Sequence, residues 1–265
     1  MTENPRAEGL VPNVSVVVTT YNRVALLTET IDSILAQTYT KFEVIIIDNM
    51  SVDGTEEYIA GLEDPRISYV RNENHGVIAV NRNMGIQMSK GKYVALCDDD
   101  DLWMADKLQL QVAIMEENPK IALCYTNAES FEGDHVIQNK MVQHVVESDF
   151  FVHLLRSNFI PNSSVVIRRS VFDKLGLLSV DTSLFEDYEM WLRIAKKYPL
   201  YGIDKALIRY RLHSSNMAGS RSVSTLRAIR TIRGLNRKLD ISWFRLQPYI
   251  LFHFLKFCFY RVAGR

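Results

Sequence analysis

Short apolar runs rich in β-branched residues alternate with segments of helical spacing through the first 100 residues, and this alternation constrains the fold more than any other feature. The runs predict strands over residues 14–19, 42–47, 67–70 and 93–97. Between them, apolar side chains three and four positions apart, or turn and cap residues, predict helices over residues 24–37, about 55–62 and 77–89. Strands that alternate with helices in this way build a parallel sheet with helices on its faces. We therefore expect an α/β fold with a doubly wound, mainly parallel sheet.

The second half of the chain has a looser pattern. It predicts helices over residues 104–117, 148–157, 170–175 and 186–197. It predicts strands over residues 121–125, 163–168 and 203–210. Residues 126–147 are polar and lack a clear period, so we expect them to form an excursion from the sheet.

Composition excludes several classes of protein. Lys and Arg together number 31, as do Asp and Glu, so no net charge indicates a nucleic-acid partner. The three cysteines are widely spaced, which excludes a disulfide scaffold and a cysteine zinc site and suits a reducing compartment. Residues 1–12 are polar and lack the apolar core of a signal peptide, so we expect a disordered leader there. The longest apolar stretch, residues 250–260, is too short to span a bilayer.

The C-terminal tail, residues 220–265, is basic and aromatic. From Arg221 onward it carries nine Lys or Arg residues before the terminal Arg265, against the single acid Asp240. This pattern predicts a helical appendage. It suits an interfacial helix on an anionic membrane, and it suits equally a helix packed on the domain or on a second copy of the chain.

Polar residues follow three of the predicted strands at the points where the strands end. Thr19 to Asn22 follow the first strand, Asp48 follows the second, and Asp98 to Asp101 follow the fourth. Ligands of open parallel sheets bind beyond the carboxyl ends of the strands. The chain has neither a glycine-rich dinucleotide fingerprint nor a P-loop, so an anionic diphosphate needs another source of positive charge. A divalent cation held by oxygen ligands supplies it, which indicates Mg²⁺ or Mn²⁺.

The four-aspartate run, residues 98–101, ends a buried strand and precedes Trp103. In an extended chain, residues two apart point the same way, so we expect Asp98 and Asp100 to face one side and Asp99 and Asp101 the other. Four adjacent carboxylates repel one another unless a cation or hydrogen-bond donors compensate. The alternative is an acidic loop or helix cap, in which Asp101 or Asp106 caps the helix over residues 104–117.

Four stretches together resemble the inverting family-2 glycosyltransferases with a GT-A fold. They are SVVVTTYNR (15–23), FEVIIIDNMSVDGT (42–55), GVIAVNRNMGIQMSKGKYVALCDDDDLW (76–103), and FEDYEMWLR (185–193) with YRLH (210–213). The resemblance covers about residues 13–213 and is densest over 14–110. It implies a GT-A domain whose nucleotide-sugar-binding half spans 13–125 and whose acceptor-side half spans 126–219.

The resemblance implies a nucleotide pocket at the first two strand ends. Thr19 and Tyr21 are expected against the base, and the carboxylate of Asp48 is expected to accept N–H donors from the base edge. A carboxylate acceptor suits uracil, thymine or guanine. Asp53, within SVDGT, is expected to be a turn and helix-cap residue.

The resemblance implies that a second group of residues binds the diphosphate and the metal. Arg82 is expected near the diphosphate, where it either binds phosphate or pairs with the aspartate run. The resemblance makes Asp100 the preferred metal ligand, places Asp98 or Asp99 toward the ribose, and leaves Asp101 in support. Asp98 is a second metal candidate, and the extra aspartate at position 99 leaves the register open by one residue.

Inverting transfer needs a base that takes the proton of the acceptor hydroxyl. The resemblance assigns this role to Asp187, with Glu186 as the alternative, at the start of the helix over residues 186–197. Carboxylates there could instead complement the helix dipole. His213 resembles a position that approaches the metal or the diphosphate.

We therefore expect a metal-dependent enzyme that moves a sugar from a nucleoside-diphosphate sugar, preferably UDP-linked, to a saccharide or lipid-linked acceptor in surface polysaccharide assembly. The expected location is the cytoplasm or the inner face of the cell membrane. A non-catalytic sugar-nucleotide-binding or assembly protein is one alternative, and it should lack one of Asp98–Asp100, Asp187 and His213. A nucleotidyltransferase is another, although it normally carries a basic, glycine-rich loop after the first strand.

Overall fold

The computed structural model describes residues 12–141, 148–213, 221–239 and 241–262. The leader expected over residues 1–12 lies outside these ranges, apart from Pro12.

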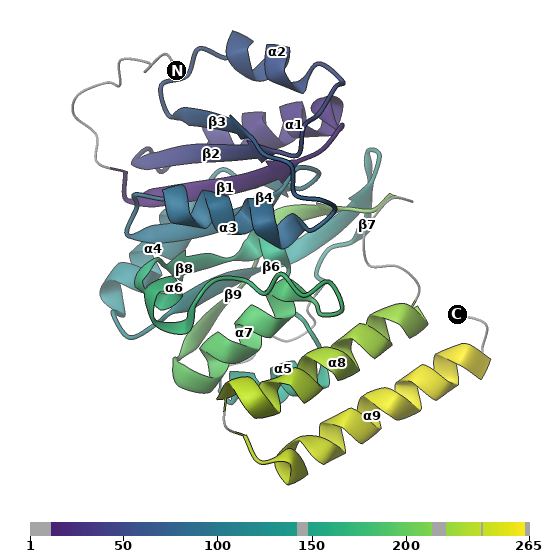
Figure 1. Ribbon diagram of the computed structural model, residues 1–265. Helices are drawn as coiled ribbons and strands as arrows, with labels where there is room; N and C mark the ends of the chain where they lie inside the picture. The colour runs from purple at the N-terminus through teal and green to yellow at the C-terminus, as the bar shows by residue number, and fades with distance from the viewer. Residues whose placement is uncertain (1–11, 142–147, 214–220, 240, 263–265) are drawn as a thin grey trace.

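The strands form one nine-stranded sheet in the order β3-β2-β1-β4-β8-β6-β9-β5, with β7 paired to β6 (Figure 1). Their bounds are β1 Val14–Thr20, β2 Phe42–Asp48, β3 Ile67–Arg71, β4 Tyr93–Asp98, β5 Leu102–Trp103, β6 Leu123–Glu132, β7 His135–Gln138, β8 Val166–Arg168 and β9 Leu200–Arg211. From β3 to β4 every pairing is parallel. Beyond β4 the sheet is mixed, because β8 runs antiparallel to both β4 and β6. The parallel sheet expected for the first 100 residues is confirmed.

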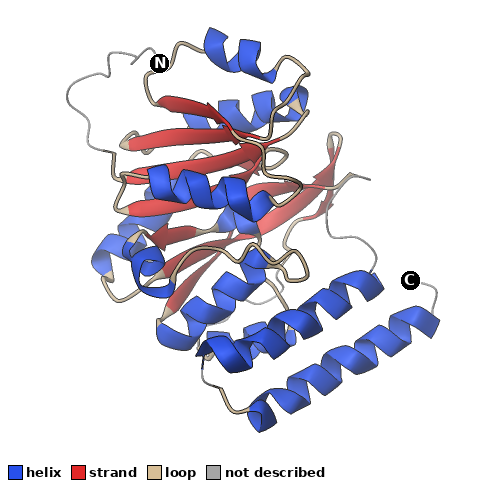
Figure 2. Cartoon of the chain, viewed as in Figure 1, coloured by secondary structure: helices blue, strands red, loops and turns tan. Residues whose placement is uncertain are grey.

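Helices cover both faces of the sheet (Figure 2). Their bounds are α1 Val24–Leu35, α2 Thr55–Gly61, α3 Ile78–Met88, α4 Lys107–Glu117, α5 Phe150–Arg156, α6 Ser170–Leu175, α7 Glu186–Lys197, α8 Arg221–Leu239 and α9 Trp243–Val262, with the 3₁₀ turn η1 at Asn162–Ser164. Alternate residues of β1 explain this layering. Val16 and Val18 pack in the cluster that contains residues of α1, and Val17 packs in the cluster that contains residues of α3. A strand buried on both faces has no polar alternation, which is why β1 reads as a continuous apolar run.

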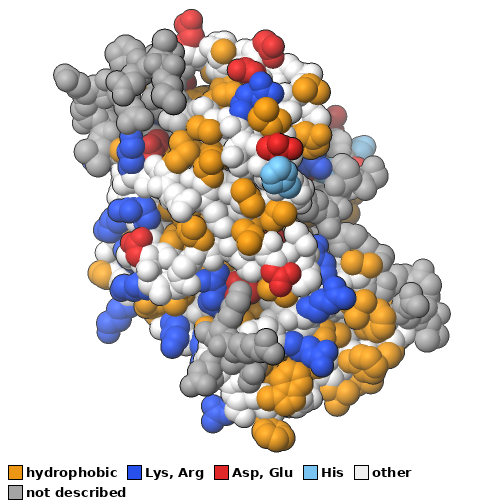
Figure 3. Space-filling view, in the orientation of Figure 1, with side chains coloured by type: hydrophobic (Ala, Val, Ile, Leu, Met, Phe, Trp, Pro, Cys, Tyr) orange, Lys and Arg blue, Asp and Glu red, His pale blue; other side chains and the backbone are white. Residues whose placement is uncertain are grey.

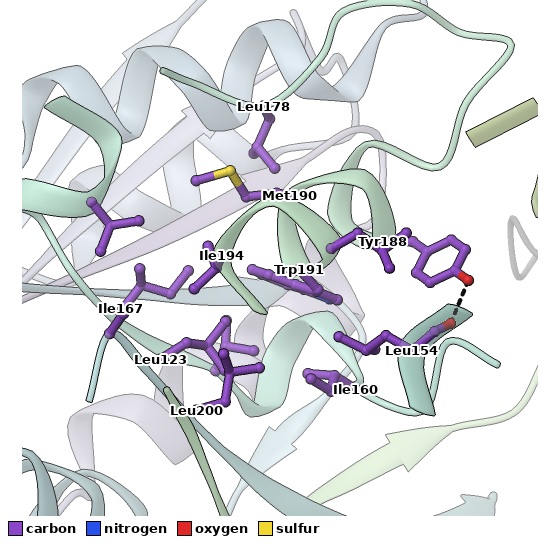
Figure 4. Packing of buried hydrophobic residues seen from close by; sticks show 14 of the residues in the cluster. Leu123, Leu154, Ile160, Ile167, Leu178, Tyr188, Met190, Trp191, Ile194 and Leu200 are labelled. Carbon is purple, nitrogen blue, oxygen red and sulfur yellow. Dashed lines mark hydrogen bonds between the residues drawn. The ribbon is translucent and has the colours of Figure 1, made fainter. Parts of the chain in front are cut away.

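The second core cluster forms where α7 meets the C-terminal half of the sheet (Figure 4). Trp191 is fully buried there, and the hydroxyl of Tyr188 donates to the carbonyl oxygen of Leu154 at 2.5 Å. This packing fixes the first turn of α7 relative to α5, which decides where Asp187 lies. The helix predicted over residues 186–197 has the same bounds as α7.

The excursion predicted over residues 126–147 is wrong in its first part, because β6 continues to Glu132 and forms a hairpin with β7. The strand was not predicted because several of its side chains are polar. Thr126 and Asn127 are buried, and the Asn127 amide donates to Asp204 of β9 at 3.1 Å. The register of β6 against β9 shifts on either side of Asn127, so the strand also lacks a regular alternation. Residues 142–147 of the predicted excursion lie outside the described part of the chain.

The tail forms the helical appendage that the sequence predicts. The helices α8 and α9 pack against each other, and α8 also packs on α7 (Figure 1). The helix α9 contacts α5, where Nε2 of His253 donates to the carbonyl oxygen of Leu155 at 3.0 Å. Within the described residues, no helix is both long enough and apolar enough to cross a membrane.

Candidate functional site

A cavity of about 870 Å³ opens at the carboxyl ends of β1 and β4. On one side it is lined by Thr19 of β1 and by Asp98 to Asp100. Glu186 and Asp187 line it from the first turn of α7. Segments that are distant in the sequence therefore meet at one cavity, as expected when ligands bind beyond the strand ends.

The aspartate run does not alternate in the expected way, because the chain turns after Asp98. Asp98, Asp99 and Asp100 all line the cavity, whereas Asp101 is buried and accepts the backbone N–H of Arg211 at 3.1 Å. The prediction that Asp98 and Asp100 face opposite to Asp99 and Asp101 is therefore wrong. The supporting position predicted for Asp101 agrees with its burial.

Neither aspartate proposed as a side-chain cap of α4 acts as one. Asp106 is the N-cap residue but makes no side-chain cap bond, and its carboxylate pairs with Lys205. Asp53 does occupy a turn, where it accepts the backbone N–H groups of Thr55 and, at 2.8 Å, of Val24 at the start of α1.

Protein cations and hydroxyls compensate the negative charge of the run. One guanidinium nitrogen of Arg23 lies 3.2 Å from Asp99 and 2.9 Å from Asp100. The hydroxyl of Thr20 donates to Asp99 at 2.7 Å. Burial nevertheless raises the pKa of Asp99 to about 6, against the opposing effects of Thr20 and Arg23. No pattern in the sequence had assigned Arg23 to the aspartate run.

Arg82 bridges the run and α7. Its guanidinium lies 2.5 Å from Asp98 and 2.5 Å from Glu186, and only 7% of its side chain is exposed. Burial opposes the charged form, but the carboxylates of Asp98 and Glu186 outweigh it and hold the pKa of Arg82 above its ordinary value. The sequence left open whether Arg82 binds phosphate or pairs with the aspartate run, and in this structure it pairs with the run. Asn162 of η1 adds a further donor to Asp98 at 2.8 Å, and no pattern in the sequence indicated it.

Asp187 has the electrostatic environment of a base. Burial and the neighbouring charge of Glu186 raise its pKa to about 7, while Arg82 acts in the opposite direction. A carboxylate with a pKa near 7 accepts a proton far more readily than an ordinary aspartate. Glu186 is held by Arg82, so the two carboxylates differ in their surroundings although they are adjacent.

The three residues predicted to contact the base lie in different surroundings. The hydroxyl of Thr19 is buried, lines the cavity and has no hydrogen-bond partner within the described residues. Tyr21 is 54% exposed and lies outside the cavity lining. Asp48 is fully buried and accepts the hydroxyls of Ser51 and Tyr69, the second at 2.6 Å. A base edge would have to compete with these donors, so contact with Asp48 stays a prediction.

Asp100 and His213 are the residues that fit a metal ion best. Nε2 of His213 lies 2.9 Å from the Asp100 carboxylate. No group of three or more His, Cys, Asp or Glu side chains forms a complete ligand set within the described ranges. Mg²⁺ and Mn²⁺ need few protein ligands when substrate phosphates and waters supply the rest, so a carboxylate beside an imidazole fits either ion.

Comparisons with known proteins point to one family. A family model described as Glycosyl transferase family 2 matches residues 15–176. TuaG of Bacillus subtilis (strain 168), a glycosyltransferase assigned to teichuronic acid biosynthesis, is 29% identical over 257 residues, which are 95% of each chain. WfgD of Escherichia coli, a UDP-Glc:alpha-D-GlcNAc-diphosphoundecaprenol beta-1,3-glucosyltransferase, is 28% identical over 210 residues, 78% of this chain and 80% of WfgD.

Two solved structures share the architecture. S. aureus TarS 1–349 in complex with UDP-GlcNAc has a TM-score of 0.72 at 18% identity, over 90% of this chain and 70% of that one. The mannosyltransferase PcManGT from Pyrobaculum calidifontis, in complex with GDP-Man and Mn²⁺, has a TM-score of 0.66 at 20% identity, over 85% and 64%. The expected GT-A fold is confirmed.

Proposed function

The chain belongs to glycosyl transferase family 2, and from this membership we propose that it moves a sugar from a nucleoside-diphosphate sugar to an acceptor hydroxyl with inversion. The observation that supports the proposal most is the position of Asp187. Its carboxyl group, with a pKa raised to about 7, lines the same cavity as the aspartate run. Neither a non-catalytic binding protein nor a nucleotidyltransferase accounts for this base as directly.

Asp187 accepts the proton of the acceptor hydroxyl while the hydroxyl oxygen attacks the anomeric carbon. The bond from that carbon to the diphosphate oxygen breaks on the opposite face, so the sugar is transferred with inverted configuration. Arg82 pairs with Glu186, and for this reason Asp187 and not its neighbour is proposed as the base. No covalent sugar–enzyme intermediate is needed.

Asp100 and His213 would hold Mn²⁺ or Mg²⁺ at the diphosphate, with Asp98 as a further ligand candidate. The cation would stabilise the negative charge that develops on the leaving nucleoside diphosphate. Asp98 or Asp99 would contact the ribose. The base would lie against Thr19 and Tyr21, and the buried, unpartnered hydroxyl of Thr19 supports its part in this assignment.

We take the donor to be a UDP-sugar and the pathway to be surface polysaccharide assembly. WfgD uses a UDP-linked sugar, and TarS binds UDP-GlcNAc. TuaG is assigned to teichuronic acid biosynthesis, and the acceptor of WfgD is linked to diphosphoundecaprenol. A lipid-linked acceptor therefore fits this chain better than a free saccharide.

The helix α9 would attach the enzyme to the membrane that carries such an acceptor. Its exposed apolar side chains recur three and four residues apart and form one face, which comprises Phe244, Leu251, Leu255 and Phe259 with Phe252 and Phe254 at its edges. Hydrophobic side chains gather with Lys and Arg over the lower right of Figure 3, where α8 and α9 lie in Figure 1. An apolar face within a basic segment complements an anionic lipid surface. The location would then be the inner face of the cell membrane.

The proposal is tested by incubating the purified protein with UDP-, GDP- and dTDP-sugars, with and without Mn²⁺, in the presence of anionic vesicles. We expect release of the nucleoside diphosphate from one donor class, and we expect EDTA to stop it. Release that is equal with and without metal would contradict the metal assignment. No release from any donor would contradict the enzyme assignment.

A further inference from the structure

The cavity has a second wall that the donor chemistry does not use. It is formed by the end of α5 and the segment after it, by α8 and by α9. This wall lies beyond α7, whereas the aspartate run lies at the ends of β1 and β4 (Figure 1). A base that serves an inverting transfer lies on the acceptor's side of the anomeric carbon. The wall beyond Asp187 is therefore where the acceptor has to bind.

Three cations line this wall, and one of them, Arg227 of α8, already donates to backbone carbonyl oxygens. The other two are Arg156 and Lys256. Arg156 ends α5 and is exposed, and Lys256 lies on α9 and is partly buried. Both line the cavity. No carboxylate within the described ranges lies within ion-pair distance of either, although the same cavity contains a dense group of acids. The described contact of Lys256 is with the ring of Phe252, 4.6 Å from its ammonium nitrogen.

The position of Lys256 in α9 connects the cavity to the apolar face. His253, Lys256 and Tyr260 line the cavity from one side of the helix. Leu255 and Phe259, 60% and 66% exposed, lie on the neighbouring outward side, since residues next in sequence in a helix are about 100° apart around its axis. A ligand with an anionic group at the cavity wall and a hydrocarbon chain along α9 would satisfy both surfaces.

We propose that Arg156 and Lys256 form a subsite for the phosphate groups of a lipid-linked acceptor and thereby present its sugar hydroxyl to Asp187. The inference rests on the proposed function, since it concerns the acceptor of that reaction. Charge-assisted hydrogen bonds from Arg and Lys are the usual means of holding phosphate oxygens. The subsite is separate from the donor's diphosphate site, which belongs to the aspartate run.

The test uses dodecyl diphosphate as the probe and measures its binding by calorimetry to the full chain saturated with UDP and Mn²⁺. Because UDP occupies the donor site, a second diphosphate has to bind elsewhere. We expect Arg156→Gln and Lys256→Gln each to weaken probe binding about tenfold, and the double variant about a hundredfold, which matches the loss of one charge-assisted bond per substitution. UDP affinity should not change in any of them, which also shows that the variants are folded.

Arg230→Gln is the matched control, because Arg230 is exposed on α8 and lies outside the cavity lining. This variant should bind the probe as the unsubstituted chain does. If Arg230→Gln weakened probe binding as much as Arg156→Gln or Lys256→Gln, general surface charge would explain the effect and the subsite would be overturned. Inorganic pyrophosphate should bind more weakly than the probe, and equal affinity would overturn the lipid-linked assignment. Unchanged binding in the double variant would overturn the inference while UDP binding persists. If the unsubstituted chain did not bind UDP at all, that result would instead contradict the proposed function.

Discussion

Charge compensation by a single buried arginine links the two halves of the candidate site. Arg82 contacts Asp98 and Glu186, and its charge lowers the pKa of Asp187. Removal of a buried cation leaves its carboxylates without a partner. This lowers the free energy of unfolding far more than the loss of a surface ion pair does. The stability of this region and the strength of the base therefore depend on the same side chain.

The first prediction concerns this arginine. Arg82→Gln should lower the free energy of unfolding by about 3 kcal/mol, measured by urea denaturation. Arg66→Gln is the control, because Arg66 and its partner Asp64 are both more exposed than Arg82 and the loss of this pair should cost less, about 1 kcal/mol. Equal losses in the two variants would show that Arg82 does not carry the charge balance of the site.

The second prediction concerns pH. Asp187 can accept a proton only as a carboxylate, and its raised pKa of about 7 means that this form is lost earlier than usual as the pH falls. We expect kcat to decrease about tenfold per pH unit below about pH 6.5, whereas an ordinary aspartate would keep kcat constant down to about pH 4. The measurement is kcat at saturating donor, with donor binding followed at each pH. A constant kcat down to pH 5 would remove Asp187 as the base.

The sequence predicted well which residues meet at the site, and it predicted the directions of their side chains poorly. Thr19 and the aspartate run could be assigned to one rim because the strands that precede them end there, whereas Arg82 and the start of α7 were placed beside them by the resemblance to family-2 glycosyltransferases. The side-chain directions within the run could not be predicted, because they depend on a turn after Asp98. Asn162 could not be predicted either, because its position depends on an antiparallel strand, β8, inserted beside β4.

At the scale of elements, α3 approaches β1 so closely that a glycine is required between them. A Cβ atom at Gly85 would lie 2.4 Å from Cγ1 of Val17, which is buried and β-branched. Since α3 also carries Arg82, this contact helps to set the depth at which the guanidinium lies.

The third prediction tests that contact. Gly85→Ala should destabilise the fold by about 2 kcal/mol despite the better helix propensity of alanine, because overpacking outweighs propensity. Gly61→Ala is the control, since a Cβ atom there meets nothing within 4 Å, and it should be neutral or slightly stabilising. The additional change Val17→Ala should recover part of the loss in the Gly85 variant. Thermal unfolding measures all three, and a stabilised Gly85→Ala would contradict the close packing.

Elements with a strong period were predictable, and elements held by long-range contacts were not. The apolar stripe of α7 gave its bounds, because tertiary packing and local pattern coincide there. The predicted strand ended at residue 125, whereas β6 continues to Glu132. Its later residues are polar, but they are buried and hydrogen-bonded to β9. Polarity predicts exposure only when no partner strand supplies hydrogen bonds.

For the whole molecule, the appendage places an apolar surface beside the acceptor wall of the cavity. This arrangement lets one helix, α9, line the cavity and present Leu255 and Phe259 to an external phase. The sequence left open whether the tail lies on a membrane, packs on the domain or contacts a second copy, because each of these buries an apolar face. The structure packs α8 on α7 and α9 on α5, and the face of α9 that stays exposed leaves the membrane and the second copy as its candidate partners.

The fourth prediction separates those partners. The protein should cosediment with vesicles that contain anionic lipid and much less with neutral vesicles, and Leu255→Glu with Phe259→Glu should weaken binding at least about tenfold. The control pair is Val136→Glu with Ile137→Glu, which changes exposed apolar residues of β7 and should have no effect. Concentration-dependent dimerisation without vesicle binding would assign the face to a second copy instead.

The central claim is that Asp187 converts a donor-binding cavity into a transferase. The most direct test compares the unsubstituted chain with Asp187→Asn in two assays, UDP-sugar affinity by calorimetry and the rate of sugar transfer at saturating donor. We predict unchanged affinity and a transfer rate lower by about 10³-fold, because the amide cannot accept the proton. Transfer at the unsubstituted rate, with the same donor affinity, would show that Glu186 or another residue is the base and would contradict the claim.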